Sequence, residues 1–327
     1  MESQKSIRVL SGIQPSGDLH LGNYFGAIAQ FRKRQDQGDE LFIFVADWHS
    51  LTTIKKADEL RKNIRQIVAA YIAFGLDAGK TTLYRQSDIP EIQELSWILS
   101  CHATMGRLTN AHSFKDKQAK GISPTVGLFY YPVLMAADIL CVQADVVPVG
   151  KDQKQHIEIC QEIAEKFNRD YGKIFKVPKG VIPEDVAVVP GTDGQKMSKS
   201  YANTIDLFAP EKKLKKQVNS IVTAPLAQGD PMDPKTCNVF QLYKLIATSE
   251  EVETLAEKYR AGSIGFGHAK LALLDKIHET FGPARAEFEK LMADEKEIDR
   301  VLALGKEKAG AVIQQTVRDV RKKVGLD

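Results

Sequence analysis

A glycine-rich stretch near the amino terminus, residues 12–23, reads G-I-Q-P-S-G-D-L-H-L-G-N. It joins a short apolar run to a helical pattern. Glycines there let the backbone approach a ligand closely, and the start of a helix offers free N–H groups to an anion. His20 and Asn23 can donate hydrogen bonds to phosphate oxygens. The spacing is not that of a dinucleotide fingerprint, and the lysine of a P-loop is missing. The stretch alone therefore fits either a phosphate site or a tight, capped connection.

A second candidate for phosphate chemistry, Lys196-Met197-Ser198-Lys199-Ser200, follows directly after Gly191-Thr192-Asp193-Gly194. Two lysines flank a small hydroxyl side chain on a loop that glycine precedes. Lysine carries a compact charge on a mobile stem, which suits it to contact phosphates as they move during a reaction. Most strings of this kind are solvated loops, but its pairing with the first stretch favours a nucleotide site.

A carboxylate lies among apolar residues in the segment 131–139, Y-P-V-L-M-A-A-D-I. In a helix, Tyr131, Met135 and Asp138 share one face because they are four and three residues apart. Pro132 suits the first turn of that helix, where its missing N–H has no consequence. A buried carboxylate needs a partner. That partner is either an N–H group of a ligand or a group of the protein core.

Polar residues also follow two strand-like runs. Val147 and Val149 alternate and so face one side, and Asp152 and Gln153 begin the next helix. His49 comes just after the run 41–46. Open α/β folds place ligands at the carboxyl ends of their strands. These positions predict a small-ligand pocket, with His49 either a ligand contact or a satisfied core residue; we favour the contact.

The elements that must hold these groups alternate between strand and helix. Strands are expected at 7–10, 41–46, 81–85 and 146–149, and helices at 21–31, 57–74, 91–105 and 153–167. This order predicts an α/β, Rossmann-like and mostly parallel sheet with right-handed crossovers. Residues 173–194 are rich in Pro and Gly and are interpreted as a connection. Strand signals stop after it. We predict a sheet domain over 1–190 and an all-helical domain over 191–327.

Composition sets the broad class. The 327 residues are 43% hydrophobic and 27% charged, as in ordinary globular proteins, and a net charge of +3 permits a nucleic-acid partner without demanding one. No signal peptide and no membrane span are predicted. The cysteines contain no C-x-x-C pair, and Cys101, Cys141 and Cys160 lie in apolar helical patterns. We expect buried, reduced thiols, a cytoplasmic location and no metal bound by protein alone.

The two phosphate motifs together resemble class I aminoacyl-tRNA synthetases, which have an early H-x-G-H-like element and a late K-M-S-K-S element. Here the late element matches letter for letter. G-I-Q-P-S-G, H-L-G-N-Y, Y-P-x-L-M-A-A-D-I-L, V-P-V-G-x-D-Q-K-Q-H and K-M-S-K-S also resemble bacterial tryptophanyl-tRNA synthetases in content and order. The resemblance spans essentially the whole chain. It implies a ligase that activates L-tryptophan with ATP, releases pyrophosphate and transfers tryptophan to its tRNA.

The resemblance also implies roles for matching residues. Asp138 would accept the indole N–H. The other tryptophan contacts would be Leu10, His49, Tyr131, Met135, Val147, Val149 and Gln153. The ATP contacts would be Gln14, His20, Gly22, Asn23, Gly150, Asp152, Lys196, Met197 and Lys199. The catalytic groups at the phosphates would be Lys117, Lys196, Ser198 and Lys199. Mg²⁺ would enter with ATP.

Partners follow from the same resemblance. The family is homodimeric, and the tRNA would meet the helical part, where lysines cluster at 211–216 and basic residues at 318–323. The last helix, from about 286 to 327, is expected to pack back on the sheet domain. Two rival functions stay open. One is a tyrosine-activating relative, although this chain lacks room for the usual extra carboxyl-terminal module. The other is a non-catalytic RNA- or nucleotide-binding paralogue, disfavoured because His20, Lys196 and Lys199 are intact.

Overall fold

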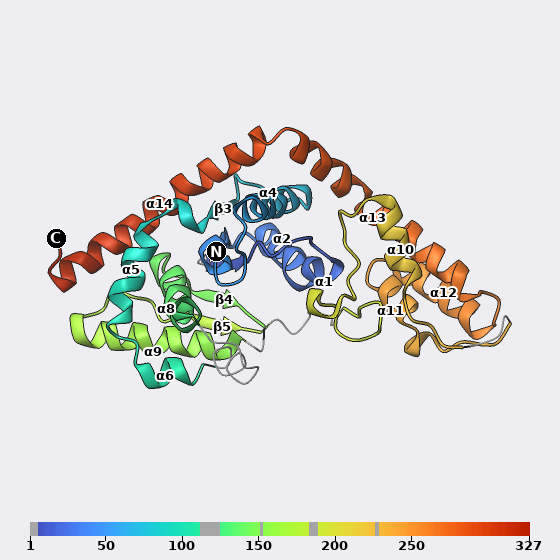
Figure 1. Cartoon of the computed structure of the whole chain (residues 1–327), viewed down its shortest axis with the longest axis horizontal. Coiled ribbons are helices and arrows are strands. Elements are labelled where there is room, and N and C mark those ends of the chain that lie inside the picture. Colours follow the sequence, from blue (N-terminus) through green and yellow to red (C-terminus); the bar gives the residue numbers. More distant parts are fainter. Residues whose placement is uncertain (1–5, 112–124, 151–152, 183–188, 226–228) are drawn as a thin grey trace, which may run out of the picture.

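A parallel sheet lies at the centre of the computed structural model, which describes residues 6–111, 125–150, 153–182, 189–225 and 229–327. Within these residues the sheet has five strands in the order β3-β2-β1-β4-β5 (Figure 1). Every neighbouring pair is parallel. The strands are β1 (Arg8–Ile13), β2 (Glu40–Val45), β3 (Thr81–Arg85), β4 (Val146–Pro148) and β5 (Lys179–Val181). The predicted parallel α/β fold is confirmed. Its strand order reverses at β1, where ligands bind in such sheets.

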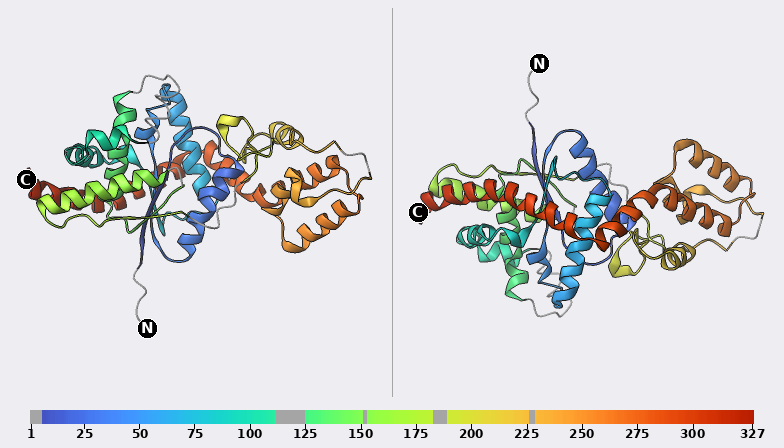
Figure 2. Two further views of the ribbon diagram at one scale, coloured as in Figure 1. Left: turned by 90° about the horizontal axis from the view of Figure 1, so that it is seen from below. Right: turned by 90° about the horizontal axis from the view of Figure 1, so that it is seen from above.

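Helices cover both faces of this sheet (Figure 2). Along β2 the side chains alternate: Phe42 and Phe44 pack in one core cluster with α5, α8 and α9, and Ile43 and Val45 pack in another with α2 and α4. The helices of this part are α1 (Leu21–Asn23), α2 (Ala29–Asp36), α3 (Asp47–Ser50), α4 (Ala57–Ala73), α5 (Glu91–Ser100), α6 (Met105–Thr109), α8 (Val126–Cys141) and α9 (Lys154–Tyr171). A π-helical turn, Tyr24–Ile28, joins α1 to α2, and a 3₁₀ turn, Gln86–Asp88, follows β3.

Three local predictions were wrong. The single helix expected over 91–105 ends at Ser100, and a separate helix α6 begins at Met105, where the Thr104 side chain accepts a hydrogen bond from the Arg107 N–H. Cys101 therefore lies beyond the end of α5 and is exposed, not buried. Pro132 is not in the first turn of its helix but inside α8. The helix starts earlier because Thr125 caps it, accepting from the Leu128 N–H at 3.3 Å.

The segment 173–194 is more than a connection. Its residues Lys179–Val181 form β5, which pairs with β4, and the Val149 N–H donates to the Val181 carbonyl at 3.0 Å. The sequence offered no apolar run to predict this strand, because all three of its residues are exposed. Gly180 packs closely on Ile157, where a side chain would be 3.1 Å from that residue's Cγ2.

After β5 the described chain contains no further strand, as predicted. Its helices are α10 (Glu211–Asn219), α11 (Asn238–Lys244), α12 (Ser249–Arg260), α13 (Phe266–Ala293) and α14 (Lys296–Val324). Helix α13 leads from the helical part to α4, and α14 returns along β3 (Figure 1). Gly305 on α14 meets the Leu83 carbonyl oxygen of β3 so closely that a Cβ atom would overlap it. Among the described residues, no helix has the length and apolar character needed to cross a bilayer.

Candidate active site

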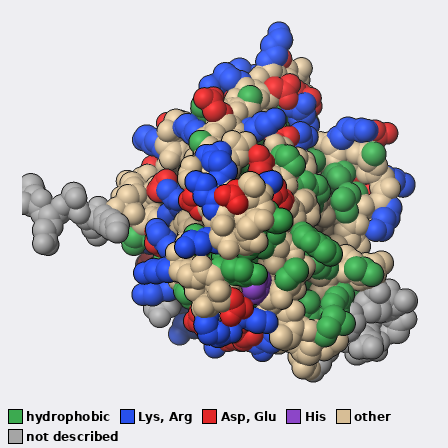
Figure 3. All heavy atoms as spheres, turned by 90° about the vertical axis from the view of Figure 1, so that its left-hand side faces the viewer, with side chains coloured by type: hydrophobic (Ala, Val, Ile, Leu, Met, Phe, Trp, Pro, Cys, Tyr) green, Lys and Arg blue, Asp and Glu red, His purple; other side chains and the backbone are tan. Residues whose placement is uncertain are grey.

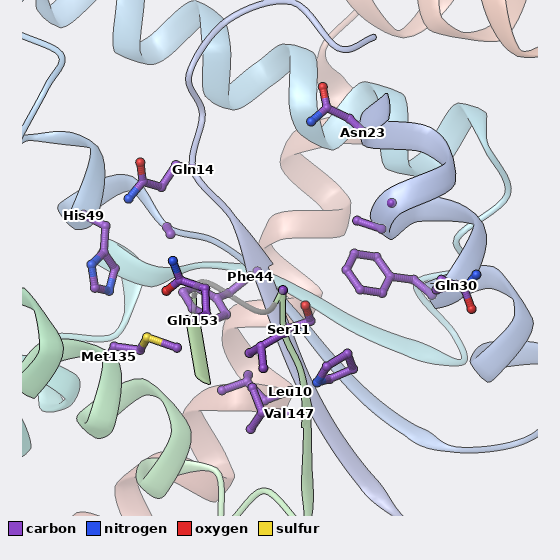
Figure 4. A pocket seen from close by; sticks show the side chains of 18 of the residues that line it. Leu10, Ser11, Gln14, Asn23, Gln30, Phe44, His49, Met135, Val147 and Gln153 are labelled. Atoms are coloured by element: carbon purple, nitrogen blue, oxygen red, sulfur yellow. The ribbon is translucent and has the colours of Figure 1, made fainter. Parts of the chain in front are cut away.

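A cavity of about 1500 Å³ opens at the carboxyl ends of β1, β2 and β4. It brings together almost all of the predicted site residues that the structure describes. Figure 4 shows His49, Met135 and Gln153 on one side and Asn23 on the other. The predicted residues that line it are Leu10, Gln14, His20, Gly22, Asn23, His49, Tyr131, Met135, Asp138, Val147, Val149, Gly150, Gln153, Lys196, Met197 and Ser198. Lys117 and Asp152 lie outside the described residues.

Asp138 is the acidic group at one end of this cavity. It is 1% exposed and lies on α8 with Tyr131 and Met135, which share its face as predicted. Its Oδ2 accepts a hydrogen bond from His49 Nε2 at 2.9 Å. Burial raises the pKa of Asp138, and the hydrogen bonds from His49 and Gln86 act in the opposite direction. The alternative of partners in the core is therefore confirmed, because His49 and Gln86 donate to the carboxylate. Asp138 also lines the cavity.

Gln86, which sequence reasoning missed, is the second partner of Asp138. Its Nε2 lies 2.7 Å from Oδ1 and 2.9 Å from Oδ2. It begins the 3₁₀ turn at the carboxyl end of β3 and is fully buried. A polar residue just after a strand of a parallel sheet was the available signal. This position after a strand predicted His49 as a site residue, but the same position was not noticed for Gln86.

The tyrosine of the same helix face has a buried histidine partner. Tyr131 Oη lies 2.5 Å from Nε2 of His156, a residue of α9 that is 1% exposed. The His49 ring meets the Tyr131 ring edge to face, with centroids 6.1 Å apart. The polar groups at this end of the cavity are thus held by α3, α8 and α9 together.

Apolar walls complete this end. Val147 and Val149 both face the cavity, as their alternation predicted, and Leu10 and Phe44 add to the wall. Gly12 allows Phe44 to approach β1, because a Cβ atom there would lie 2.7 Å from the Phe44 ring. The walls are apolar and Asp138 offers an acceptor, so this end can hold an apolar group that carries a hydrogen-bond donor.

The other end of the cavity is formed by the two phosphate motifs. His20 precedes helix α1, and the backbone N–H of His20 donates to Asn23 Oδ1 at 3.2 Å. The Leu21 N–H donates to the Ile205 carbonyl at 3.0 Å, and the Leu207 N–H to the Leu19 carbonyl at 2.9 Å. These bonds join the first motif to the strand-like segment that follows the second. The motifs are 183 residues apart at Ser16 and Lys199, yet Lys199 Nζ lies 3.1 Å from the Ser16 carbonyl.

His20 is a neutral imidazole at this end. It is 6% exposed, and burial together with the nearby Lys199 lowers its pKa from 6.5 to about 4. Among the described residues, no hydrogen-bond partner reaches its Nδ1. Gly22 allows the ring to lie against α1, because a Cβ atom at Gly22 would be 2.9 Å from two ring atoms. His20 can therefore donate one hydrogen bond to an anion without adding a charge.

The loop of the second motif is held by Asn203, another residue that the sequence did not reveal. Asn203 is 2% exposed; its Oδ1 accepts from the Ser198 N–H at 2.8 Å, and its Nδ2 donates to Asp193 Oδ1 at 2.7 Å and to the Lys196 carbonyl at 3.2 Å. Lys196, Met197 and Ser198 line the cavity, whereas Lys199 does not. The loop thus presents one lysine to the cavity and keeps the other beside the first motif.

The cavity extends along the first helix beyond the predicted residues. Gly26 and Ala27, in the π-helical turn, and Gln30, in α2, also line it. A π turn offsets the side chains that follow it, and such turns are common at functional sites. The helical period of the sequence does not reveal this offset.

The arrangement has two chemically different ends. One is apolar with a buried acceptor, and the other carries lysine, imidazole and amide donors close to a helix start. Such a site can hold a ligand that combines an apolar group with a polyanion. Within the described ranges, no group of three or more His, Cys, Asp or Glu side chains is placed to hold a metal ion.

Several known proteins are similar to this chain. The family model for class I tRNA synthetases (W and Y) matches residues 1–282. A tryptophan–tRNA ligase from Fusobacterium nucleatum subsp. nucleatum is 50% identical over 320 residues, which cover 98% of this chain and 98% of that protein. One from Rhodopirellula baltica is 48% identical, covering 98% and 100%. The crystal structure of tryptophanyl-tRNA synthetase from Campylobacter jejuni complexed with ADP and tryptophan has a TM-score of 0.95 at 46% identity, covering 98% of this chain and 100% of that one.

Proposed function

Because the chain belongs to the class I tRNA synthetases for tryptophan and tyrosine, we propose which of its residues carry out the reaction. The enzyme activates L-tryptophan with ATP, forming tryptophanyl-adenylate and pyrophosphate, and transfers tryptophan to its tRNA. The observation that carries the assignment of residues is Asp138, a buried acceptor in the wall of an apolar cavity whose other end carries phosphate-binding groups.

We assign the Asp138 end to the amino acid. Asp138 accepts the indole N–H, and Leu10, Val147 and Val149 contact the ring. His49, Tyr131, Met135 and Gln153 complete this end and reach the α-amino group. A site built to pair with a polar group of its substrate can reject an analogue that lacks that group by roughly 10⁴–10⁵-fold. A pocket of this kind makes a separate editing site unnecessary.

We assign the other end to ATP. Gln14, His20, Gly22, Asn23 and Gly150 hold the nucleotide, with Asp152 and Met197. Lys196, Ser198, Lys199 and Lys117 stabilise the charge that develops on the phosphates. Mg²⁺ arrives with the nucleotide and neutralises its phosphate oxygens. The chain contributes cationic, imidazole and amide groups at this end, which fit phosphate oxygens directly.

The reaction consists of two transfers. The tryptophan carboxylate oxygen attacks the α-phosphorus, the bond to the bridging oxygen breaks, and pyrophosphate leaves with both electrons of that bond. A terminal ribose hydroxyl of the tRNA then attacks the acyl carbon, and AMP leaves. We assign no covalent nucleophile to the chain, because positioning and charge stabilisation supply most of the rate in such transfers. We attribute this chemistry to residues 1–190 with the 196–200 loop, and tRNA binding to the remaining helices.

We propose that the enzyme works in the cytoplasm as a homodimer. Large apolar side chains are exposed on α5, α6 and α8: Trp97 is 71% exposed, Met105 68% and Val126 81%. Figure 3 shows hydrophobic side chains gathered on the side of the molecule that carries these helices. An apolar surface of this kind is typical of a protein interface. Sedimentation of the protein and of Trp97→Lys tests it; a variant as dimeric as the parent would contradict this face.

The lysine cluster at 211–216 is not wholly free for tRNA. Lys213 Nζ lies 3.1 Å from Asp18 Oδ2 and 2.8 Å from Asp206 Oδ2. It connects α10 to the first motif and to the segment that follows the second. We therefore propose the other lysines of this cluster, with the basic residues of 318–323, as tRNA contacts.

ATP–pyrophosphate exchange tests the function directly. Exchange is expected with tryptophan and not with tyrosine; exchange that tyrosine supports and tryptophan does not would overturn the substrate. Replacing both Lys196 and Lys199 by Ala is expected to slow exchange strongly and to leave tryptophan binding intact. A double variant with unchanged exchange would refute the role of the loop. A parent protein that supports exchange with neither amino acid would favour the non-catalytic paralogue.

A further inference from the structure

The carboxylate of Asp138 has a defined set of partners and a defined free acceptor position. A carboxylate has about four lone-pair sites. Among the described residues, Oδ2 accepts from His49 and Gln86, whereas Oδ1 accepts from Gln86 alone. Oδ1 therefore has the greater capacity to accept a further hydrogen bond. The direction in which this free acceptor position points depends on how the carboxylate is rotated. The groups that donate hydrogen bonds to the carboxylate determine that rotation.

Gln86 is the donor that contacts both oxygens. Its own orientation is determined by a third group, because the Trp48 N–H donates to Gln86 Oε1 at 3.1 Å. Turning the amide over would place its NH₂ against that N–H and its oxygen against the carboxylate. The Gln86 side chain thus has one favourable orientation, in which it directs its NH₂ group toward the Asp138 carboxylate.

Gln86 cannot act on the ligand itself. It is 0% exposed and does not line the cavity, whereas Asp138 does. It belongs to the 3₁₀ turn that follows β3, 52 residues before Asp138. Any effect of Gln86 on the reaction must therefore pass through the carboxylate.

We infer that Gln86 is a positioning residue that determines specificity: it holds the Asp138 carboxylate so that its free acceptor site faces the indole N–H. This inference rests on the proposed pairing of Asp138 with the indole. Without Gln86, the carboxylate keeps only its hydrogen bond from His49 and can rotate away from the substrate. The enzyme would then bind the ring by its apolar walls and lose its preference for a ring that carries N–H.

The test compares tryptophan with L-3-benzothienylalanine, in which sulfur replaces the indole N–H. Gln86→Met keeps the length of the side chain without its donors. Loss of a hydrogen bond to a charged group predicts that the ratio of kcat/KM for tryptophan to that for the analogue falls by about ten-fold. The ratio separates positioning from a general loss of structure, which would lower both rates together.

Gln35→Met is the matched control. Gln35 is also a buried glutamine, 6% exposed, and it makes three hydrogen bonds, to the Gly75 carbonyl, the Asp77 N–H and Thr81. Gln35 is a residue of α2, and its hydrogen bond with Thr81 places its side chain at the amino end of β3, away from the cavity. For Gln35→Met, the ratio of kcat/KM for tryptophan to that for the analogue is expected to stay within about two-fold of the parent value. Gln86→Glu gives a second variant, which keeps an acceptor for the Trp48 N–H and places a second carboxyl group against Asp138. The two carboxyl groups then share a proton, so Asp138 no longer offers a full carboxylate to the indole N–H, and the ratio is also expected to fall.

Asp138→Asn separates the two levels of the proposal. If Asp138→Asn leaves the ratio unchanged, the pairing of Asp138 with the indole is wrong. If Asp138→Asn lowers the ratio but folded Gln86→Met and Gln86→Glu keep the parent value, the pairing stands and the role of Gln86 is refuted. A fall in the Gln35→Met ratio equal to that of Gln86→Met would also refute it.

Discussion

His20 is expected to make the folded protein sensitive to mild acid. Its pKa in the folded protein is lowered from 6.5 to about 4, first by burial and then by the charge of Lys199. Above pH 6.5 the imidazole is neutral in both the folded and the unfolded chain. As the pH falls below 6.5, the unfolded chain binds a proton that the folded protein does not, so the free energy of unfolding decreases. The effect is complete once the pH is below about 4.

The size of the effect follows from the two pKa values. At about 1.36 kcal/mol for each pKa unit, the lowering corresponds to about 3 kcal/mol of stability lost at pH 4, and about 2 kcal/mol is already lost at pH 5. His20→Asn removes the titrating group and keeps a small polar side chain before α1. Relative to the parent, this variant should gain about 2 kcal/mol of stability between pH 7.5 and pH 5, whatever its stability at pH 7.5.

Urea unfolding followed by circular dichroism at several pH values between 7.5 and 5 measures this difference. His268→Asn, at an exposed position of α13, is the control, and because it leaves His20 in place its unfolding is expected to follow that of the parent. If the difference in free energy of unfolding between His20→Asn and the parent stays constant over this pH range, the conclusion that His20 is buried as a neutral imidazole is refuted.

Three further substitutions test how the elements support the site. Gly22→Ala would displace the His20 ring, because the new Cβ atom would lie 2.9 Å from it. This variant should raise KM for ATP about ten-fold and leave the affinity for tryptophan unchanged. An unaltered KM for ATP would show that the ring can move freely. Asn203→Ala leaves the Ser198 N–H without its acceptor and should lower kcat of pyrophosphate exchange about ten-fold. The affinity for tryptophan, measured by calorimetry, should stay constant. Equal losses of exchange rate and of tryptophan affinity would indicate general misfolding. Gly305→Ala would overlap the Leu83 carbonyl and should lower the free energy of unfolding by about 3 kcal/mol in urea, and a neutral effect would mean that α14 is not firmly packed on β3.

Local patterns in the sequence predicted the parallel sheet and some of the residues of the cavity, whereas the resemblance to a known family supplied the others. β3 begins and ends where it was predicted. Tyr131, Met135 and Asp138 share a face because positions three and four apart meet on a helix. Val147 and Val149 face one side because side chains alternate along a strand. These geometries depend on neighbours in the chain, so the sequence alone determines them.

The contacts that orient the functional groups were decided by the tertiary structure. Gln86 lies 52 residues from Asp138, and Lys199 lies 183 residues from Ser16. Neither pairing leaves a periodic signal in the sequence. Strand β5 was missed for a related reason: its exposed residues Lys179–Val181 form a strand only because β4 offers them a free edge. The sequence by itself therefore determined which chemical groups the enzyme has and on which faces they lie. Which partner holds each group, and in what orientation, depends on hydrogen bonds between distant segments that form only when the chain is folded.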